Sequence, residues 1–206
     1  MRVPVKLFLA SSNPGKLQEY RVLVENAAPS AAISVELALL PKFDSLPAFA
    51  ENAPTFAENA AGKALHYSRS SERLVFADDS GLVVPALGGA PGVHSARYAG
   101  ADATNLQRIQ KLLKEMRDKA RPERSAHFVC AIALARACRA LAVVTDRVEG
   151  EILESPRGTG GFGYDPVFYF PALKKTFAEL SPEEKNLHSH RGKAFRKLLA
   201  ALPSML

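Results

Sequence analysis

The chain has 206 residues, 47% of them hydrophobic, which is enough for the core of one α/β domain. It has no apolar run of about 18 residues and no charged start followed by a long apolar stretch, so neither a membrane span nor a signal peptide is expected. The net charge of +6 favours polyanionic partners. The two cysteines, Cys130 and Cys138, lack zinc-site spacing and are expected to be reduced, packed thiols of a cytoplasmic protein.

The first half of the chain is predicted to alternate strands and helices. In order, the hydrophobic spacing indicates a buried strand over 5–10, a helix over 15–27, a weaker strand over 31–40, a loop over 41–54 and a helix over 55–68. Residues 74–84 then look like two strand pieces broken by Asp78-Asp79-Ser80-Gly81. The glycines and prolines of 85–100 predict irregular structure.

The second half predicts a hairpin between helices. A helix capped by Asp102 or Thr104 should run to about Asp118, and two strands over 125–134 and 139–148 should follow, joined near 135–138. Beyond a second glycine-rich loop, Ser181 and Pro182 open a capping box, and a last helix over 193–202 is stopped by Pro203. Because of the hairpin, the sheet should be mixed and not purely parallel.

The turn after the first strand has the small polar residues and final Gly15-Lys16 of a phosphate loop. The pattern Gly-x-x-x-x-Gly-Lys-Ser/Thr is not met, because no glycine lies five positions before Gly15 and Leu17 follows Lys16. The turn is therefore either a phosphate loop of another kind or only a tight turn.

Two adjacent carboxylates, Asp78 and Asp79, follow an apolar run directly. A hard cation such as Mg²⁺, which takes one or two carboxylates together with substrate phosphate oxygens, would neutralise them. A turn in which they cap backbone amides explains them equally well.

The loop over 158–166 holds four glycines within six positions, together with Phe162 and Tyr164. Glycine lets the backbone approach a ligand closely, and an aromatic ring presented there can stack on a nucleobase. The alternative is a bulged hairpin in which both rings fill the core.

Cationic side chains gather over 184–193 and near the second helix. His188-x-His190 lacks a third soft ligand, so the segment suits donation to a base carbonyl or a phosphate better than metal binding. An exposed basic turn is the alternative. On the second helix, Asn59 and Lys63 share a face, which is either a solvated face or the flank of a phosphate site.

Together these segments are the parts of an Mg²⁺–nucleoside triphosphate site. They also resemble a known family, the inosine triphosphate pyrophosphatases or XTP/dITP diphosphatases. Six stretches, in the family's order and spanning nearly the whole chain, carry the resemblance: 9–16, 55–60, 77–82, 87–98, 158–166 and 189–192.

The resemblance implies hydrolysis of ITP, dITP and XTP to the monophosphate and pyrophosphate, which removes deaminated purines from the nucleotide pool. It implies one domain over 1–206, with a long mixed sheet flanked by helices and two lobes with the active site in the cleft between them. Mg²⁺ is the expected cofactor and a homodimer the expected assembly, with neither nucleic acid nor a membrane as partner.

The resemblance also assigns roles by position. Asp79 would be the proton acceptor, with Lys16 and Lys63 stabilising the charge of the reaction. The metal ligands would be Asp79, Asp78 and Glu51. The substrate would contact Ser11, Ser12, Asn13, Pro14, Gly15, Lys16, Ser80, Phe162, Gly163, Tyr164, Asp165, Lys185, His190 and Arg191. His190 and Arg191 can donate to a 6-oxo group but would be left unpaired by the 6-amino group of adenine.

Two positions depart from the family's pattern. Ala48 stands where members often carry a metal-binding glutamate, so either Glu51 substitutes for it or the metal shell relies on Asp78, Asp79 and water. The same departure motivates the alternative of a catalytically weakened nucleotide-binding relative. A pyrophosphatase for other modified nucleotides is the remaining alternative. His94 stands where members often have a bulky residue, and the resemblance places it near the cleft.

Overall fold

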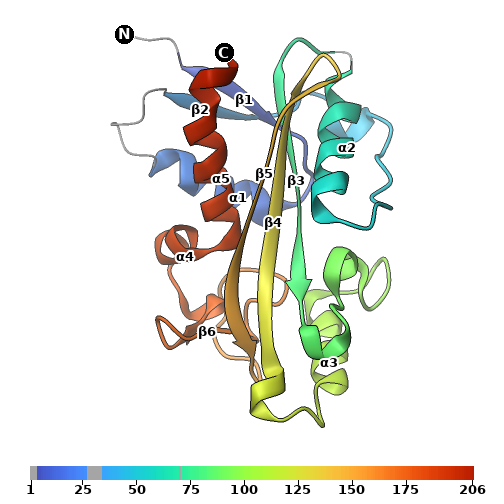
Figure 1. Cartoon of the computed structure of the whole chain (residues 1–206), viewed down its shortest axis with the longest axis vertical. Helices are drawn as coiled ribbons and strands as arrows, with labels where there is room; N and C mark the ends of the chain where they lie inside the picture. The colour runs from blue at the N-terminus through green and yellow to red at the C-terminus, as the bar shows by residue number, and fades with distance from the viewer. Residues whose placement is uncertain (1–3, 27–33, 70) are drawn as a thin grey trace.

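A seven-stranded mixed sheet forms the centre of the molecule (Figure 1). The computed structural model describes residues 4–26, 34–69 and 71–206. The strands lie in the order β2-β1-β3-β4-β5-β6-β7; β1 runs parallel to β2 and β3, and each later pair is antiparallel. Their bounds are β1 (Val5–Leu9), β2 (Val35–Leu39), β3 (Leu74–Val83), β4 (Ser125–Arg136), β5 (Arg139–Ile152), β6 (Phe168–Phe170) and β7 (Lys175–Thr176). The predicted mixed α/β class is confirmed.

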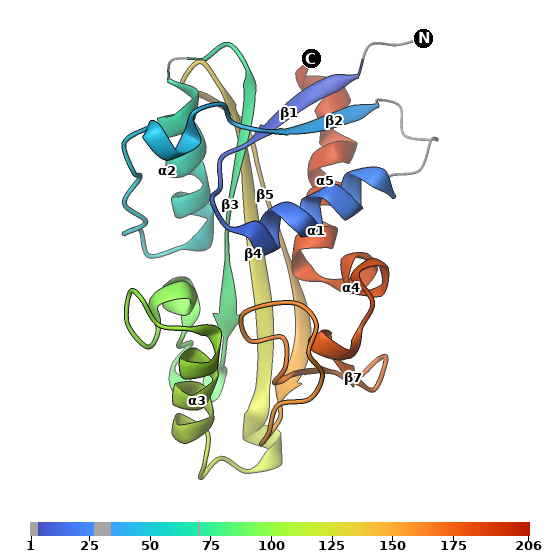
Figure 2. The same ribbon diagram turned by 180° about the vertical axis from the view of Figure 1, so that it is seen from behind.

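Helices cover both faces of the sheet (Figures 1 and 2). On one face lie α1 (Pro14–Glu25) and α5 (His190–Ala201), with the short α4 (Pro182–His188) packed against both. On the other lies α2 (Phe56–Ser68), against β3 and β4. Strand alternation divides the core accordingly, because Leu7 and Leu9 pack on the α1/α5 face, whereas Phe8 and Ala10 pack on the α2 face.

The long strands β3, β4 and β5 connect two lobes. In Figures 1 and 2 the upper lobe contains β1, β2, α1, α2 and α5, and the lower lobe contains α3 (Asn105–Glu115), β6, β7 and the loops around them. The lower lobe has its own apolar cluster, in which Leu112 and Met116 from the α3 region meet Phe128, Phe168 and Phe177. The two-lobed arrangement places the loops of both lobes opposite each other.

One strand differs from its prediction. The residues expected to interrupt it, Asp78 to Gly81, continue β3 without a break, each paired with a residue of β4 from Ile132 to Val129. The prediction of two pieces is wrong because tertiary contacts, not a turn, accommodate the two carboxylates: Lys16 and Arg191 pair with Asp78, and Asn59 and the Ser80 amide donate to Asp79. The irregular stretch over 85–100 contains two short 3-10 helices, η2 (Pro85–Leu87) and η3 (Gly92–Arg97).

Local capping sets the helix starts. Thr104 and Ser181 cap α3 and α4 through the backbone amides of Gln107 and Glu184, as the sequence predicts. Ser189 accepts from the Gly192 amide and so begins α5 at His190, three residues earlier than predicted. The expected helix end at residue 27 and strand start over 31–33 lie outside the described residues.

The cysteines have different environments. Cys130 is buried in the sheet, whereas Cys138 is exposed in the β4–β5 turn, so the expectation of two packed thiols is wrong for Cys138. Within the described ranges, no helix is both long and apolar enough to cross a membrane.

Candidate active site

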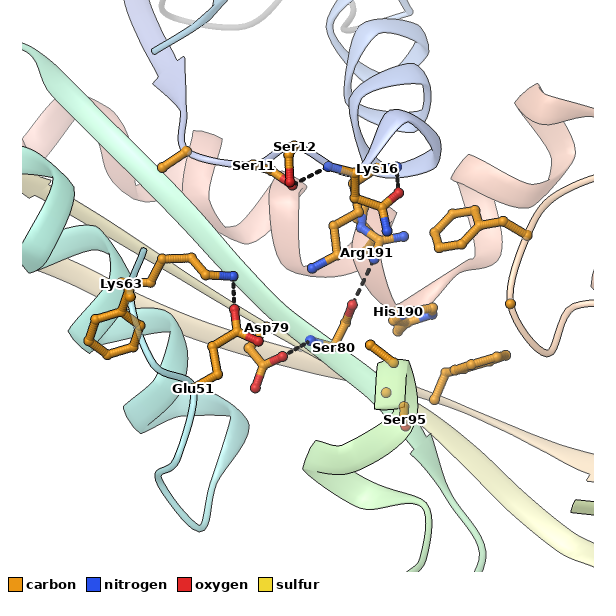
Figure 3. A pocket seen from close by; sticks show the side chains of 18 of the residues that line it. Ser11, Ser12, Lys16, Glu51, Lys63, Asp79, Ser80, Ser95, His190 and Arg191 are labelled. Carbon is orange, nitrogen blue, oxygen red and sulfur yellow. Dashed lines mark hydrogen bonds and ion pairs between the residues drawn. The ribbon is translucent and has the colours of Figure 1, made fainter. Parts of the chain in front are cut away.

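A cavity of about 500 Å³ lies between the lobes, with β3 along its floor (Figure 3). The upper lobe contributes Ser11, Ser12, Asn13 and Lys16 after β1, and the lower lobe contributes Ser95 and Phe162. In parallel sheets ligands bind outside the carboxyl ends of the strands, which is where this turn after β1 stands.

Adjacent carboxylates on β3 point to opposite faces of the sheet. Asp78 and Ser80 lie on the α1/α5 face, where the Arg191 Nη2 donates to the Ser80 Oγ at 2.8 Å. Asp79 lies on the α2 face, where its Oδ2 accepts from the Asn59 Nδ2 at 3.0 Å. Figure 3 shows Asp79 and Glu51 on one side of the strand, and Lys16 and Arg191 on the other. Because the two carboxylates point to opposite faces of the sheet, one metal ion cannot be coordinated by both in the way that two carboxylates on the same face would allow.

Asp78 is the buried anion of an ion-pair network. Its side chain has 0% exposure, and its Oδ2 lies 3.1 Å from the Lys16 Nζ and 3.4 Å from the Arg191 Nη2. Burial alone would raise the pKa of Asp78, but Lys16 and Arg191 outweigh it and hold that pKa below its usual value. Asp78 does not line the cavity and serves to fix two cations that do.

Asp79 has the opposite electrostatics. Burial, together with repulsion from the Glu51 carboxylate, raises the pKa of Asp79 to about 6, although Lys16 and Asn59 act against the shift. Its Oδ1 accepts from the Ser80 amide at 2.9 Å, so the carboxylate is held in one orientation. Asp79 lines the cavity and is a carboxylate that gains from a cation or a proton.

Residues 47–54, which we call the strap, carry Glu51 to this side of β3. The Glu51 carboxylate pairs with Lys63 of α2. The Asn59 side chain accepts from the Ala53 amide at 2.9 Å and donates to the Ala53 carbonyl at 3.2 Å. Asn59 thus holds the strap and Asp79 together. The Lys63 Nζ also donates to the Asp78 carbonyl at 3.3 Å, as does the Lys16 Nζ at 3.3 Å.

A second charged cluster lies on the α1/α5 face, around Glu19 of α1. Its carboxylate pairs with Arg191 and, at 2.5 Å, with the Lys185 Nζ, which also lies 2.5 Å from the Asp165 Oδ2. Burial would lower the pKa of Lys185, but Asp165 and Glu19 outweigh it and raise that pKa, so Lys185 stays charged. The predicted basic turn is therefore buried and not solvated: Lys185 and Arg191 are 5% and 1% exposed.

The two aromatic residues of the glycine loop have different roles. Tyr164 fills the lower core and donates from its hydroxyl to the Ser95 carbonyl at 3.0 Å, which is the core-filling alternative. Phe162 lines the cavity, with the Lys185 Nζ 4.9 Å and the Arg191 guanidinium 5.5 Å from its ring centre. A Cβ on Gly15 would lie 2.6 Å from the Phe162 ring, so this glycine gives close approach to an aromatic ring.

His190 stacks on Phe128 at the same end of the cavity, with ring centres 4.8 Å apart. Burial, reinforced by Arg191 and Lys185, holds the pKa of His190 well below its usual value, so the ring is neutral. In the part of the chain that the structure describes, its Nδ1 has no hydrogen-bond partner. A buried polar atom of this kind favours a ligand that supplies the partner.

Comparison with known proteins gives this geometry a family. The sequence model of the Ham1 family matches residues 7–201. The chain belongs to the Ham1 family. It is 52% identical over 193 residues to a dITP/XTP pyrophosphatase of Geobacillus kaustophilus, covering 94% of this chain and 92% of that protein. A similar protein of that name from Gloeobacter violaceus is 50% identical over 194 residues, with 94% and 92% covered.

Solved structures of Ham1 proteins agree with the fold. A HAM1 protein from Coxiella burnetii has a TM-score of 0.82 at 41% identity, covering 97% of this chain and 99% of that one. The Staphylococcus aureus Ham1 protein also has a TM-score of 0.82, at 36% identity, covering 97% and 98%. The resemblance inferred from the sequence motifs is confirmed.

In this Ham1-family chain most of the predicted site residues meet in the one cavity. The following line it: Ser11, Ser12, Asn13, Lys16, Glu51, Lys63, Asp79, Ser80, Phe162, Gly163, Tyr164, Asp165, Lys185, His190 and Arg191. Pro14, Gly15 and Asp78 do not. Pro14 begins α1, and Asn13 caps that helix by accepting from the Lys16 amide at 3.1 Å.

Two residues that organise the site were not predicted. Glu19 falls on the same helix face as Lys16 and the buried Tyr20, and this spacing of three and four was the available signal. Asn59 was placed on the face of Lys63, but no feature of the sequence connected it with Asp79. His94 is exposed and does not line the cavity itself, although Ser95 and Ala96 directly after it do. Ala48 lines it, as does Glu51.

The residues present suit a hard cation. Within the described ranges, no group of three His, Cys, Asp or Glu side chains forms a metal site by itself. Glu51 and Asp79 nevertheless face one cavity, where burial and, to a lesser degree, the Glu51 charge raise the pKa of Asp79. Two oxygen ligands with room for phosphate and water fit Mg²⁺, which seldom uses an all-protein cage.

Proposed function

We propose that the chain hydrolyses dITP, ITP and XTP to the corresponding monophosphate and pyrophosphate, and so removes deaminated purines from the nucleotide pool. The observation that carries this proposal is one cavity with two unlike ends. One end holds Phe162 with Lys185 and Arg191. The other end holds the carboxylates of Asp79 and Glu51 together with Lys16 and Lys63. The dITP/XTP pyrophosphatases that the chain resembles support the choice of substrate.

At the base end, the protein leaves few donors for the substrate. Of the three N–H groups of Lys185, two face Glu19 and Asp165. Of the five donors of Arg191, contacts to Glu19, Asp78 and Ser80 use four. The remaining donors suit the 6-oxo group of hypoxanthine or xanthine, whereas the 6-amino group of adenine would oppose donor to donor. Phe162 would stack on the purine.

At the phosphate end, Glu51 and Asp79 would hold Mg²⁺. When bound, the ion would neutralise phosphate oxygens and acidify a water molecule. Asp79 is the proton acceptor for the water that attacks the α-phosphorus, and its raised pKa suits that task. Lys16 and Lys63, oriented by the Asp78 carbonyl, stabilise the charge that develops as pyrophosphate leaves. Asp78 orients cations and does not bind the metal in this proposal.

A substrate panel tests the proposal. The protein is mixed with Mg²⁺ and ITP, XTP, dITP or ATP, and pyrophosphate is measured. Release from the first three and far less from ATP is expected, and no release from any of the first three would overturn it.

The alternative of a catalytically weakened nucleotide-binding relative is not favoured, because Glu51 supplies a carboxylate in the cavity even though residue 48 is an alanine. A preference for other modified nucleotides is not favoured either. The homodimer and the cytoplasmic location remain predictions.

A further inference from the structure

The strap that carries Glu51 lies along one face of α2. The Tyr67 Oη accepts from the Phe49 amide at 3.2 Å, and His66 hydrogen-bonds to the Pro47 carbonyl at 2.8 Å. With the Asn59 contacts to Ala53 and the pairing of Lys63 with Glu51, these bonds hold the strap from one end to the other. All these contacts come from the upper lobe, so they position the strap against α2 without reference to the lower lobe.

A further contact reaches the strap from the lower lobe. The Nη2 of Arg97, the last residue of η3, donates to the Glu51 carbonyl at 2.9 Å. Arg97 itself does not line the cavity. It bonds the backbone of the residue whose carboxylate faces Asp79, so its contact with the cavity runs through Glu51.

The position of η3 is itself set by β3. The buried Ser95 Oγ accepts from the Leu82 amide at 2.9 Å and donates to the Gly92 carbonyl at 2.6 Å. Gly81 lets η3 pack closely on β3, since a Cβ there would lie 2.3 Å from the Ser95 Oγ. A short path of direct contacts thus runs from Asp79 along β3 to Ser95, then through Arg97 to Glu51.

We propose that Arg97 is a positioning residue that sets the spacing of Glu51 and Asp79 and thereby the affinity for the divalent cation. This inference rests on the proposed function, in which those two carboxylates hold Mg²⁺. Partners beyond the ligands orient them, and losing such a partner commonly lowers metal affinity tenfold or more. Arg97 provides that support across the cleft. It donates to the backbone of Glu51, while η3, which carries Arg97, is bonded to β3, which carries Asp79.

Binding of Mn²⁺ without turnover tests the inference. Mn²⁺ is titrated into the protein with the non-hydrolysable α,β-methylene analogue of ITP, and free Mn²⁺ is followed by electron paramagnetic resonance. Arg97→Gln is expected to raise the dissociation constant for Mn²⁺ about tenfold. The affinity for IMP, which reports the base end, should stay unchanged. Unchanged Mn²⁺ affinity, or an equal loss of IMP affinity from general loosening of the lobes, would overturn it.

Matched variants separate position from charge and from folding. Arg73→Gln removes the same charge from an exposed arginine that lies 4.9 Å over the Phe8 ring, and should bind Mn²⁺ like the unaltered protein. In a Glu51→Gln background, adding Arg97→Gln should not raise the dissociation constant for Mn²⁺ any further. A further, additive loss of Mn²⁺ affinity would contradict the inference. Arg97→Met repeats the test, with the same expected result, if the glutamine variant does not fold.

The two proposals fail in different ways. Pyrophosphate release by the unaltered protein together with equal Mn²⁺ affinity in Arg97→Gln and its parent would leave the proposed function standing and remove Arg97 from its role. Absence of pyrophosphate release from every deaminated purine triphosphate would overturn the proposed function itself.

Discussion

Asp78 and Asp79 share a peptide bond, yet the two faces of β3 give them opposite chemistry. On the α1/α5 face, Asp78 is closed to solvent and paired with Lys16 and Arg191, which lower its pKa. On the α2 face, Asp79 lines the cavity beside Glu51, and its pKa rises to about 6. Backbone alternation thus separates a buried, paired anion from one that lines the cavity.

The same division organises the whole cavity. Cations around Glu19 and Asp78 are satisfied within the protein and present few free donors to a base. Around Asp79, burial and the charge of Glu51 raise the pKa of the carboxylate, although Glu51 itself pairs with Lys63. In the proposed function, the end around Glu19 and Asp78 recognises the base and the end around Asp79 carries the chemistry, and the two ends meet at β3. The predictions below, ordered from the largest effect, test whether the two faces are as different as their surroundings indicate.

Asp79→Asn should abolish most turnover. Removing the proton acceptor and a proposed metal ligand is expected to lower kcat for ITP about 10³-fold, equivalent to about 4 kcal/mol of activation free energy. The fold should persist, because an amide can still bond to Asn59 and Ser80 without a charge to bury. Pyrophosphate release and urea unfolding measure the two effects, and near-normal turnover would remove Asp79 from its catalytic role.

Asp78→Asn should act mainly on stability. The change leaves Lys16 and Arg191 with one buried anion fewer, and is expected to lower the free energy of unfolding by about 3 kcal/mol. Because Asp78 is outside the cavity, affinity for Mn²⁺ should survive in the folded variant, in contrast to Asp79→Asn. Urea unfolding with parallel Mn²⁺ titration makes the comparison, and loss of Mn²⁺ binding with intact stability would reverse the assignments.

Asp79 and Asp78, on the two faces of β3, should make the free energy of unfolding depend on pH in opposite directions. Asp79 titrates at about 6 in the folded state against 3.8 as its reference, so the folded state binds more protons between these values. Metal-free protein should therefore lose on the order of 3 kcal/mol of stability from this group as the pH rises through that window. Asp78, whose pKa is lowered, contributes stability that is lost as the pH falls.

The measurement is urea unfolding across pH in a chelator, with Asp79→Asn as the reference. The free energy of unfolding of the variant, minus that of the unaltered protein, should rise between pH 3.8 and about 6 and then level off. A flat difference would mean that Asp79 is not perturbed by its surroundings.

Those parts of the fold that depend on nearby residues could be predicted from the sequence. Thr104 and Ser181 cap their helices through amides three residues away, and the β4–β5 hairpin follows from two apolar runs and a short turn. The continuity of β3 could not be predicted. It depends on Lys16 and Arg191, which lie 62 and 113 residues from Asp78 and neutralise a carboxylate that otherwise indicates a turn.

Site residues could be predicted where they belong to a sequence motif. They could not be predicted where their role depends on a contact with a residue far along the chain. Phe162 and Tyr164 look alike in the loop, but Tyr164 reaches the Ser95 carbonyl and Phe162 reaches the cavity. Glu19 carries no motif of its own, since its importance comes from Lys185 and Arg191 on two other helices. Only tertiary packing distinguishes these cases.

The smallest predicted effect concerns the base end, where Gly15 makes room for the Phe162 ring. In Gly15→Ala the new Cβ would lie 2.6 Å from that ring and must displace it. Lost stacking should raise KM for ITP about fivefold, or about 1 kcal/mol, with little change in kcat because the Asp79 face is untouched. Steady-state kinetics measure the change. Phe162→Leu should raise KM similarly, and Gly15→Ala should add nothing to it, because both variants remove the same contact. Equal loss of kcat in Gly15→Ala would mean that the base and phosphate ends are coupled, so that the two faces of β3 do not act separately.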